Sequence, residues 1–448
     1  MTEISAGESG GVERAPLSLQ LDFLRLMDGG GGWGPFGPRF TVVAGWRVEG
    51  EIDLDTLHGA MHDVVARHET LRTRLVLDPD DPHQEIHPPS APRLVISDLD
   101  PSAEDRDAVA EAFINAIEED DELGIDEIPG LRVYLGRFDA KDSVLAYMAH
   151  HTAVDGYSVH LVMRDLAAFY AARKEGRPVD LPPARQYREF VAHQLEHADD
   201  AQSRAARAFW REELAGARMT PLANDRPRAT GAYTTGWHRY MFSDELDTAV
   251  QEFARTSRSS PFMVLMAAFL TVLRERTGET DLVVPTFMPG RGPAWTADVI
   301  GTFYNFTPLR VDLSGCETFT DAVAAVRRSC LAAYRHELPF LQLAGEAPEL
   351  MASVVTPRAA PVVFQVIQSP FMRGEDQVAD LRFAAIRRRT ISSAAGSQIP
   401  DGMLVSAELH PAGGIGGRVG YTDMFDESTV VDIMTRLREV LRTEVERG

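Results

Sequence analysis

Cysteine is scarce in this sequence of 448 residues, and no apolar run is long enough to span a bilayer. The two cysteines, Cys316 and Cys330, have a spacing that matches no metal-binding motif, so we expect reduced thiols in a cytoplasmic protein. Residues 1–14 lack the basic start and the apolar core of a signal peptide. We expect these residues to form a flexible polar leader.

Positive charge is also in short supply, with 45 Lys and Arg against 67 Asp and Glu and a formal net charge of -22. A nucleic-acid partner requires a positive surface, so this balance argues against that class of function. Hydrophobic residues make up 44% of the chain and charged residues 25%, which is ordinary for a soluble globular protein and predicts no association with a membrane.

The chain is longer than one hydrophobic core usually supports, so we expect two lobes. The strongest linker signal is the proline-containing run at residues 178–183. We therefore place an N-terminal lobe at residues 15–178 and a C-terminal lobe at residues 179–448. Both halves mix strand and helix patterns, which predicts an α/β fold of the α+β sandwich type.

The stretch from Ser143 to Arg173 carries the strongest functional signal. Residues 143–150 form a short apolar run that predicts a buried strand, and from Tyr157 apolar residues recur every three or four positions, which predicts an amphipathic helix. Between them lies the sequence HHTAVDG at residues 150–156. Perturbed titratable groups concentrate at functional sites, and this junction collects several such groups.

The two adjacent histidines, His150 and His151, leave a strand and point to opposite faces, so at most one of them faces a given cavity. Asp155 can either orient the imidazole of His151 or pair with an arginine from elsewhere. Gly156 permits a backbone turn, or a close approach of substrate, that a Cβ atom would block. Each residue alone is explained more simply by packing, and their combination favours a site.

The HHTAVDG sequence resembles the HHxxxDG motif of the condensation domains of nonribosomal peptide synthetases, a superfamily that includes chloramphenicol acetyltransferase. Further stretches resemble other segments of this family and occur in the family's order, so the resemblance covers about residues 15–445. These stretches are APLSLQ at residues 15–20, HETLRTR at 68–74, VPTFMPGR at 284–291, GTFYNFTPLR at 301–310, LPF at 338–340 and GYTDMF at 420–425.

The resemblance implies two chloramphenicol acetyltransferase-like lobes set in a V, with the HHxxxDG loop at the floor of a tunnel that two substrates enter from opposite ends. It implies a catalytic group of His151, Asp155 and Gly156, with His151 near the reacting atoms. Asp155 is implied to be chiefly structural, held by an arginine for which Arg291 and Arg72 are the candidates. His150 is expected to support the site, and the residues expected to contact substrate are Ser158, Asn305 and Gln365.

The implied function is that of a free-standing, monomeric condensation enzyme without a bound cofactor. It transfers an acyl or aminoacyl group from a phosphopantetheine thioester on a carrier protein to an amine or hydroxyl acceptor. A neutral imidazole can accept a proton from the attacking group, or it can only position the acceptor and stabilise the tetrahedral intermediate. The alternatives within the fold are a coenzyme A-dependent acyltransferase and a condensation-like domain that only binds a partner.

Docking of a carrier protein or of coenzyme A, which are both anionic, would require a local basic patch on this acidic chain. A solvated helix face or an ordinary surface loop is the simpler explanation for every basic cluster in the sequence. The two candidate patches are Arg204, Arg207, Arg211 and Arg218, and the run Arg387, Arg388 and Arg389.

A competing motif lies at residues 193–197. His193, Glu196 and His197 match the H-x-x-E-H metallopeptidase pattern, in which two histidines bind zinc and the glutamate acts as the base. At about 100° per residue, both histidines fall away from the apolar side of the predicted helix and towards solvent. Because a catalytic zinc needs a shielded pocket with supporting partners, we expect no metal at this motif.

Overall fold

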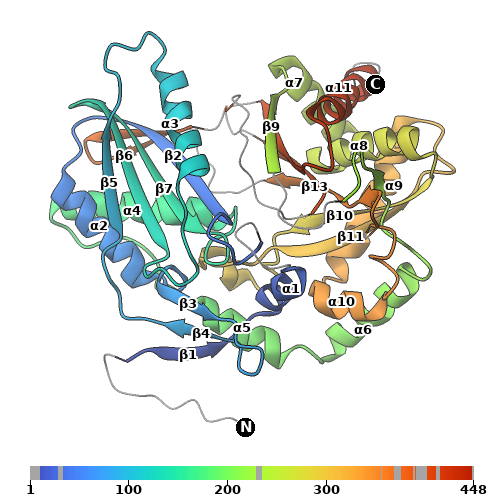
Figure 1. Cartoon of the computed structure of the whole chain (residues 1–448), viewed down its shortest axis with the longest axis horizontal. Helices are drawn as coiled ribbons and strands as arrows, with labels where there is room; N and C mark the ends of the chain where they lie inside the picture. The colour runs from blue at the N-terminus through green and yellow to red at the C-terminus, as the bar shows by residue number, and fades with distance from the viewer. Residues whose placement is uncertain are drawn as a thin grey trace.

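The computed structural model describes residues 11–28, 34–228, 235–354, 356–367, 375–386, 389, 401–409 and 414–445. Figure 1 shows two lobes side by side, which join at the end of the molecule that carries α1 (Leu19–Met27) and lean apart at the other end. This arrangement is the V that the resemblance implied.

The N-terminal lobe is built on a mixed six-stranded sheet in the order β14-β15-β2-β7-β6-β5. Helices α2 and α4 pack on one face of this sheet and α3 packs on the other. The bounds are β2 (Thr41–Glu49), α2 (Leu54–Arg67), β5 (Arg93–Asp98), α3 (Arg106–Asp120), β6 (Leu131–Asp139), β7 (Asp142–His150), α4 (Ser158–Glu175), β14 (Glu375–Val378) and β15 (Leu381–Ala385).

Strand β7 lies in the middle of this three-layer arrangement and is buried from Ser143 to His150. A strand covered on both faces needs a continuous apolar run, which explains why residues 143–150 do not alternate. Strands β6 and β7 pair antiparallel across the tight turn at residues 139–142, with Leu131 of β6 opposite Ala149 of β7. The loop that follows β7 is therefore anchored at the best-buried strand of the lobe.

The C-terminal lobe surrounds the apolar helix α8, which the side chain of Ser260 caps at its start and Gly278, with φ 76°, ends. One sheet has the order β13-β16-β17-β9, and β10 pairs with β11. The bounds are β9 (Thr235–Met241), α7 (Asp244–Thr256), α8 (Pro261–Thr277), β10 (Asp281–Met288), β11 (Asn305–Asp312), α9 (Phe319–Arg335), α10 (Phe340–Glu346), β13 (Val362–Ile367), β16 (Met403–Leu409), β17 (Ile415–Thr422) and α11 (Glu427–Val445).

Shorter elements complete the fold, and several of them lie at the end where the lobes join (Figure 1). A small sheet in the order β1-β4-β3 begins at Glu13, so the last part of the leader predicted at residues 1–14 belongs to a strand, while residues 1–10 lie outside the described residues. The bounds are β1 (Glu13–Pro16), β3 (Thr73–Val76), β4 (His83–Ile86), α5 (Tyr187–Glu196), α6 (Ala201–Glu213), β8 (Leu222–Ala223), β12 (Ala359–Ala360) and two 3-10 helices (Glu69–Arg72 and Ala294–Asp298).

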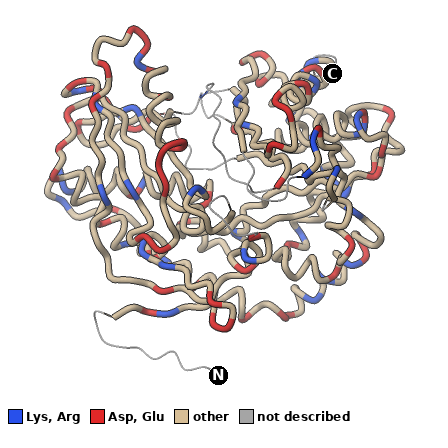
Figure 2. The backbone as a smooth tube through the Cα atoms, viewed as in Figure 1, with Lys and Arg blue, Asp and Glu red and all other residues tan. Residues whose placement is uncertain are grey.

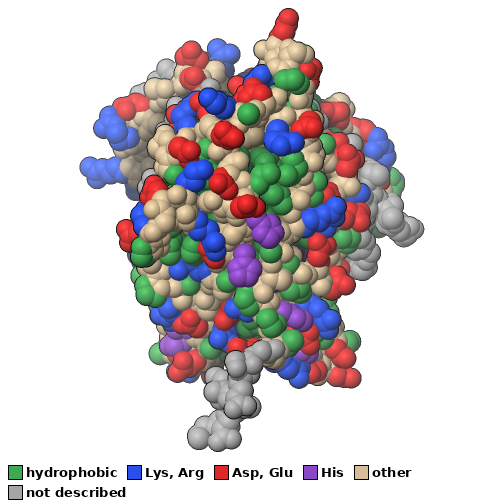
Figure 3. All heavy atoms as spheres, turned by 90° about the vertical axis from the view of Figure 1, so that its left-hand side faces the viewer, with side chains coloured by type: hydrophobic (Ala, Val, Ile, Leu, Met, Phe, Trp, Pro, Cys, Tyr) green, Lys and Arg blue, Asp and Glu red, His purple; other side chains and the backbone are tan. Residues whose placement is uncertain are grey.

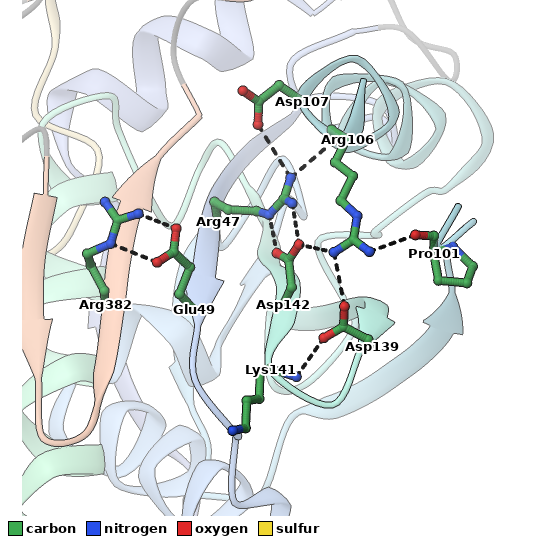
Figure 4. Close-up of polar contacts among 9 residues, drawn as sticks. All are labelled: Arg47, Glu49, Pro101, Arg106, Asp107, Asp139, Lys141, Asp142 and Arg382. Atoms are coloured by element: carbon green, nitrogen blue, oxygen red, sulfur yellow. Dashed lines mark hydrogen bonds and ion pairs between the residues drawn. The ribbon is translucent and has the colours of Figure 1, made fainter. Parts of the chain in front are cut away.

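The boundary placed at residue 178 divides the chain but does not separate the two lobes in space. Strands β14 and β15 come from the C-terminal half and extend the N-terminal sheet, where Arg382 of β15 forms an ion pair with Glu49 of β2 (Figure 4). In the other direction, α1 packs Leu21 and Leu24 into the C-terminal core. The lobes are therefore interwoven, and a cavity between them has walls from both.

No single helix among the described residues is both long and apolar enough to cross a membrane. Helices α7 and α8 together satisfy the length and composition of a bent span, with an angle of 105° between them.

Candidate active site

The loop after β7 begins with two histidines that face different surroundings. His150 is buried, with Nδ1 2.7 Å from Thr152 Oγ1 and Nε2 3.1 Å from the carbonyl oxygen of Gly37. Burial lowers the pKa of His150 to about 4, so this imidazole is neutral at pH 7. His150 therefore supports the loop, and both of its ring nitrogens are occupied by protein groups.

His151 is half-buried and lines a cavity next to the loop. Its Nδ1 lies 3.0 Å from the carbonyl oxygen of Val154, and because a carbonyl only accepts, Nδ1 carries the proton and Nε2 is left as an acceptor. The ring stacks on Phe40, with centroids 4.8 Å apart, and meets the edge of Tyr304 at 5.2 Å. The imidazole is thus held in one tautomer and one orientation.

The electrostatic surroundings of His151 keep it neutral. Burial lowers its pKa, the carboxylate of Asp155 opposes this shift, and the positive charge of Arg418 adds to it. A neutral imidazole with a free Nε2 is the form that can accept a proton.

Asp155 joins the histidine loop to the C-terminal lobe through an ion pair and backbone hydrogen bonds. Its two carboxylate oxygens lie 3.1 and 3.2 Å from Nη2 of Arg291, and they accept from the backbone N–H groups of Ser158 at 2.7 Å and Phe303 at 3.1 Å. The alternative in which Asp155 orients His151 is not the arrangement found, because the carbonyl of Val154 holds that ring.

Arg291 is the arginine that pairs with Asp155, and Arg72 is not. Nη1 of Arg291 donates to the carbonyl oxygens of Thr296 at 2.6 Å and Val299 at 2.7 Å, so the guanidinium also fixes its own loop. Arg72 instead donates to the carbonyl of His87 and lies 4.0 Å from Glu69. Arg72 makes no ion pair or hydrogen bond with Asp155, so the expectation that it pairs with Asp155 is wrong.

The loop that carries Arg291 requires a glycine at the preceding position, Gly290. Gly290 has φ 66°, and a Cβ atom there would lie 1.8 Å from the carbonyl oxygen of Phe303. Gly156 is less constrained, since a Cβ atom would meet only Ile367, at 3.9 Å. The turn at Gly156 therefore does not require a glycine, and close approach of substrate stays a prediction because Gly156 lines the cavity.

The three residues expected to contact substrate are in different places. Ser158 is buried and accepts from Nη2 of Arg291 at 2.8 Å, and Asn305 is buried between the backbone of Leu338 and Phe340. Neither lines the cavity, so both are structural residues and the expectation is corrected. Gln365 does line the cavity, where its amide donates to Ser406 Oγ at 2.7 Å.

The cavity beside His151 has a volume of about 260 Å³ and walls from both lobes. Strand β2 and the histidine loop form one side, and strands β9, β13, β16 and β17 form much of the other. Sequence reasoning did not place several side chains in this cavity, although the motifs at residues 284–291 and 301–310 contain two of them and a candidate docking patch contains a third. These side chains are Trp237, Arg239, Phe287, Tyr304, Arg389, Glu408 and Arg418.

Tyr304 places a hydroxyl group in this site. Its Oη atom is buried and has no hydrogen-bond partner among the described residues. Burial raises the pKa of Tyr304, so the hydroxyl stays protonated and can donate. A buried donor without a partner carries a desolvation cost that a bound substrate atom can relieve.

The competing motif on α5 does not form an enclosed site. Glu196 and His197 are exposed, and His193 is half-buried beside Trp295. The two imidazoles stack at 4.1 Å, and Nδ1 of His197 lies 2.8 Å from the carbonyl of His193. Within the described parts of the chain, no group of three or more His, Cys, Asp or Glu side chains is arranged to hold a metal ion.

Comparison with known proteins identifies the family. A family model described as the condensation domain matches residues 39–446. The chain belongs to the condensation-domain family. Condensation domains are transferases that form amide bonds in nonribosomal peptide synthesis.

This condensation domain is similar to one solved protein over nearly all its length. It shares 42% identity and a TM-score of 0.92 with SgcC5 from Streptomyces globisporus, over 97% of this chain and 99% of that chain. The first condensation domain of the calcium-dependent antibiotic synthetase shares the fold alone, at 19% identity and a TM-score of 0.76 over 97% of this chain and 96% of that chain. The lobes therefore have the chloramphenicol acetyltransferase-like fold.

A sequence relative shows the same domain inside a longer protein. The condensation domain is 32% identical over 317 residues to the phosphinothricin tripeptide synthetase PhsC of Streptomyces viridochromogenes. The matched region is 70% of this chain but only 29% of PhsC.

Proposed function

We propose that this condensation domain acts as a free-standing acyltransferase. It moves an acyl or aminoacyl group from a phosphopantetheine thioester on a carrier protein to the amine or hydroxyl group of a small acceptor. The observation that carries this proposal is His151, whose free Nε2 faces a cavity with walls from both lobes. The similarity to SgcC5, at 42% identity, supports this proposal.

The proposed step uses the neutral imidazole of His151 as the base. As the acceptor attacks the thioester carbon, its proton moves to Nε2, while Nδ1 keeps its hydrogen bond to Val154. The C–S bond then breaks, and the proton on Nε2 passes to the departing thiolate. The products are an amide or ester and a free phosphopantetheine thiol, and His151 returns to its neutral form.

The acceptor in this proposal is a hydroxyl compound with an aromatic group as well as an amine. SgcC5 was solved in complex with (R)-(-)-1-(2-naphthyl)-1,2-ethanediol, a diol that carries an aromatic ring. The cavity of this chain offers aromatic walls from Trp237, Phe287 and Tyr304, against which such a ring can pack. We therefore include ester formation in the proposed activity.

Every arginine of the first candidate docking patch forms an ion pair with a carboxylate of this chain. Acidic and basic residues are also spread over both lobes (Figure 2), and on the outer face of the N-terminal lobe they are mixed with hydrophobic and histidine side chains (Figure 3). The ion pairs of the candidate patch are ordinary surface pairs. The pairs in the patch are Arg204 and Arg207 with Asp199, Arg211 with Glu346, and Arg218 with Glu349.

The second candidate patch is only partly described, since Arg387 and Arg388 lie outside the described residues. Arg389 is 9% exposed and pairs with Glu118, so it belongs to the interior and not to a docking surface.

The two free cysteines are consistent with action in a reducing cytoplasm, where we place this activity.

The experiment that tests the proposed function compares two donors. Carrier proteins loaded with different aminoacyl groups, and the matching coenzyme A thioesters, are mixed with a panel of amine and hydroxyl acceptors, and acyl loss is followed by intact mass. We expect loss of acyl mass from a carrier protein with formation of an amide or ester. Transfer from coenzyme A thioesters alone would replace this function by the coenzyme A-dependent one.

A further inference from the structure

Part of the cavity wall carries three arginines that the proposed acyl transfer does not use. They are Arg239 on β9, Arg389 just after β15 and Arg418 on β17. Glu408 on β16 is the one carboxylate among the described residues that line this cavity. The charged part of the lining therefore presents three guanidinium groups and a single carboxylate to a bound molecule.

A buried glutamate behind the wall occupies two of the arginines. Arg389 donates to both carboxylate oxygens of Glu118, at 2.9 and 2.7 Å, and Arg239 donates to Oε2 at 2.9 Å. Burial alone raises the pKa of Glu118, but these arginines outweigh it and leave the pKa lowered. Glu118 lies on α3, so the cluster also ties the N-terminal lobe to β9 of the C-terminal lobe.

Arg418 is the least occupied of the three arginines. Its side chain is 33% exposed, its nearest contact with Glu118 is 3.9 Å, and it makes no hydrogen bond to a described residue. Its guanidinium lies over the indole of Trp237, 4.0 Å from the ring centroid. Burial and the neighbouring Arg389 lower the pKa of Arg418, although Glu118 and Glu408 both act in the opposite direction. Its positive charge is only partly balanced by the protein.

We infer that Arg418, supported by Arg239 and Arg389, binds a carboxylate group of one of the substrates beside His151. A guanidinium matches a carboxylate in planar, bidentate geometry, and a site partly shielded from water strengthens that pair. The apolar neighbours Trp237 and Leu404 suit the hydrocarbon part of such an acid. This inference deepens the proposed acyl transfer and rests on it for the role of the bound acid.

A phosphate of the phosphopantetheine arm cannot be the anion that Arg418 binds beside His151. Arg418 and His151 line the same cavity. When the thioester lies at His151, the phosphate lies the whole length of the arm away. The anion at Arg418 therefore belongs to the acceptor or to the acyl group.

Direct binding tests the site without any catalysis, and so separates failure of this site from failure of the proposed function. Phenylacetate and its neutral isostere phenylacetamide are titrated into the purified protein in a calorimeter. We expect phenylacetate to bind roughly tenfold to a hundredfold more tightly, because a hydrogen bond to a charged group is gained. Equal binding of the two probes, or no measurable binding of phenylacetate, would overturn the inference.

Three variants make the binding test specific. Arg418→Gln should remove the preference for phenylacetate, and Arg418→Lys should keep part of it because the charge remains. Arg218→Gln makes the same change of net charge at an exposed pair with Glu349 and should keep the preference in full. A preference that survives in Arg418→Gln, measured on protein with an unchanged melting temperature, contradicts the assignment.

The acyl-transfer assay then assigns the carboxylate to one substrate. One series compares acceptors that differ only in a carboxylate or a carboxamide, and a second series compares acyl donors that differ in the same way. The series whose preference disappears in Arg418→Gln identifies the substrate that carries the acid. No preference in either series would mean that the site plays no part in the reaction.

Discussion

Arg291 and Asp155 form a buried ion pair between the two halves of the chain, with Nη2 of Arg291 3.1 Å from Oδ1 of Asp155 and both side chains nearly inaccessible to solvent. Asp155 belongs to the loop that presents His151, and Arg291 follows β10 in the C-terminal lobe. The position of the proposed base therefore depends on a contact between lobes.

Removal of Asp155 should destabilise the protein as well as reduce its activity. In Asp155→Ala the charge of Arg291 stays buried without its carboxylate, which lowers the free energy of unfolding by about 3–5 kcal/mol. Urea denaturation measures this loss. The control Arg218→Ala, at a pair with both side chains more than half exposed, should lose about 0–1 kcal/mol. An Asp155→Ala protein that unfolds like the wild type but is inactive would make Asp155 a direct participant in the reaction.

The low pKa of His150 predicts how stability depends on pH. The folded state resists protonation of His150 until about pH 4, whereas the unfolded chain binds that proton below the ordinary value of 6.5. Stability from this group is thus complete above 6.5 and is lost as the pH falls towards 4. Between about pH 7.5 and about pH 5 the loss is on the order of 2 kcal/mol. His150→Gln should show a weaker pH dependence in denaturant unfolding, and an unchanged slope would refute this account.

Tyr304 should contribute to turnover and not to folding. Tyr304→Phe keeps the ring beside His151 and removes a hydroxyl that has no hydrogen-bond partner among the described residues. We expect the free energy of unfolding to stay the same or to rise, because the variant loses a buried donor that has no partner among the described residues. We expect kcat to fall about tenfold, because in the proposed reaction this hydroxyl donates to the oxygen on which negative charge develops. A rise in KM with kcat unchanged would show instead that the hydroxyl only binds the acceptor.

The histidines of α5 should be dispensable. The structure gives His193 and His197 no enclosed pocket, and the proposed acyl transfer requires only an imidazole and a reactive thioester. We predict that His193→Ala is fully active and that elemental analysis of the wild type finds no stoichiometric metal. Stoichiometric zinc, together with acyl transfer that a chelator abolishes, would make the motif at residues 193–197 the candidate catalytic site in place of His151.

Local sequence patterns predict the strand, loop and helix around His151, because β7 is a short continuous apolar run and apolar residues follow it at helical spacing. They do not predict that α4 is buried on most sides, with Asp165 among its buried residues. The alternation of a strand also separates the roles of His150 and His151. The choice between Arg291 and Arg72 is not local, since 136 positions separate Arg291 from Asp155 and only the folded chain brings them together.

Contacts between distant strands account for what the sequence does not show. The crossing of β14 and β15 into the N-terminal sheet pairs Arg382 with Glu49 across 333 positions, and no local pattern encodes that partner. Arg418 and Tyr304 meet at one cavity from separate strands and loops. Ser158 and Asn305 are polar residues near the motif whose hydrogen bonds are satisfied within the protein, which the sequence alone does not reveal.

Single-turnover transfer with His151 replaced is the measurement that tests the central claim most directly. A loaded carrier protein and an acceptor are mixed with excess enzyme, and the rate of acyl loss is followed by intact mass for the wild type and for His151→Ala. We predict a rate lower by about 10²–10⁴ in the variant, with an almost unchanged melting temperature, because the base is lost while the structural pair of Asp155 and Arg291 remains. A folded His151→Ala protein that transfers the acyl group at a rate close to that of the wild type would contradict the account.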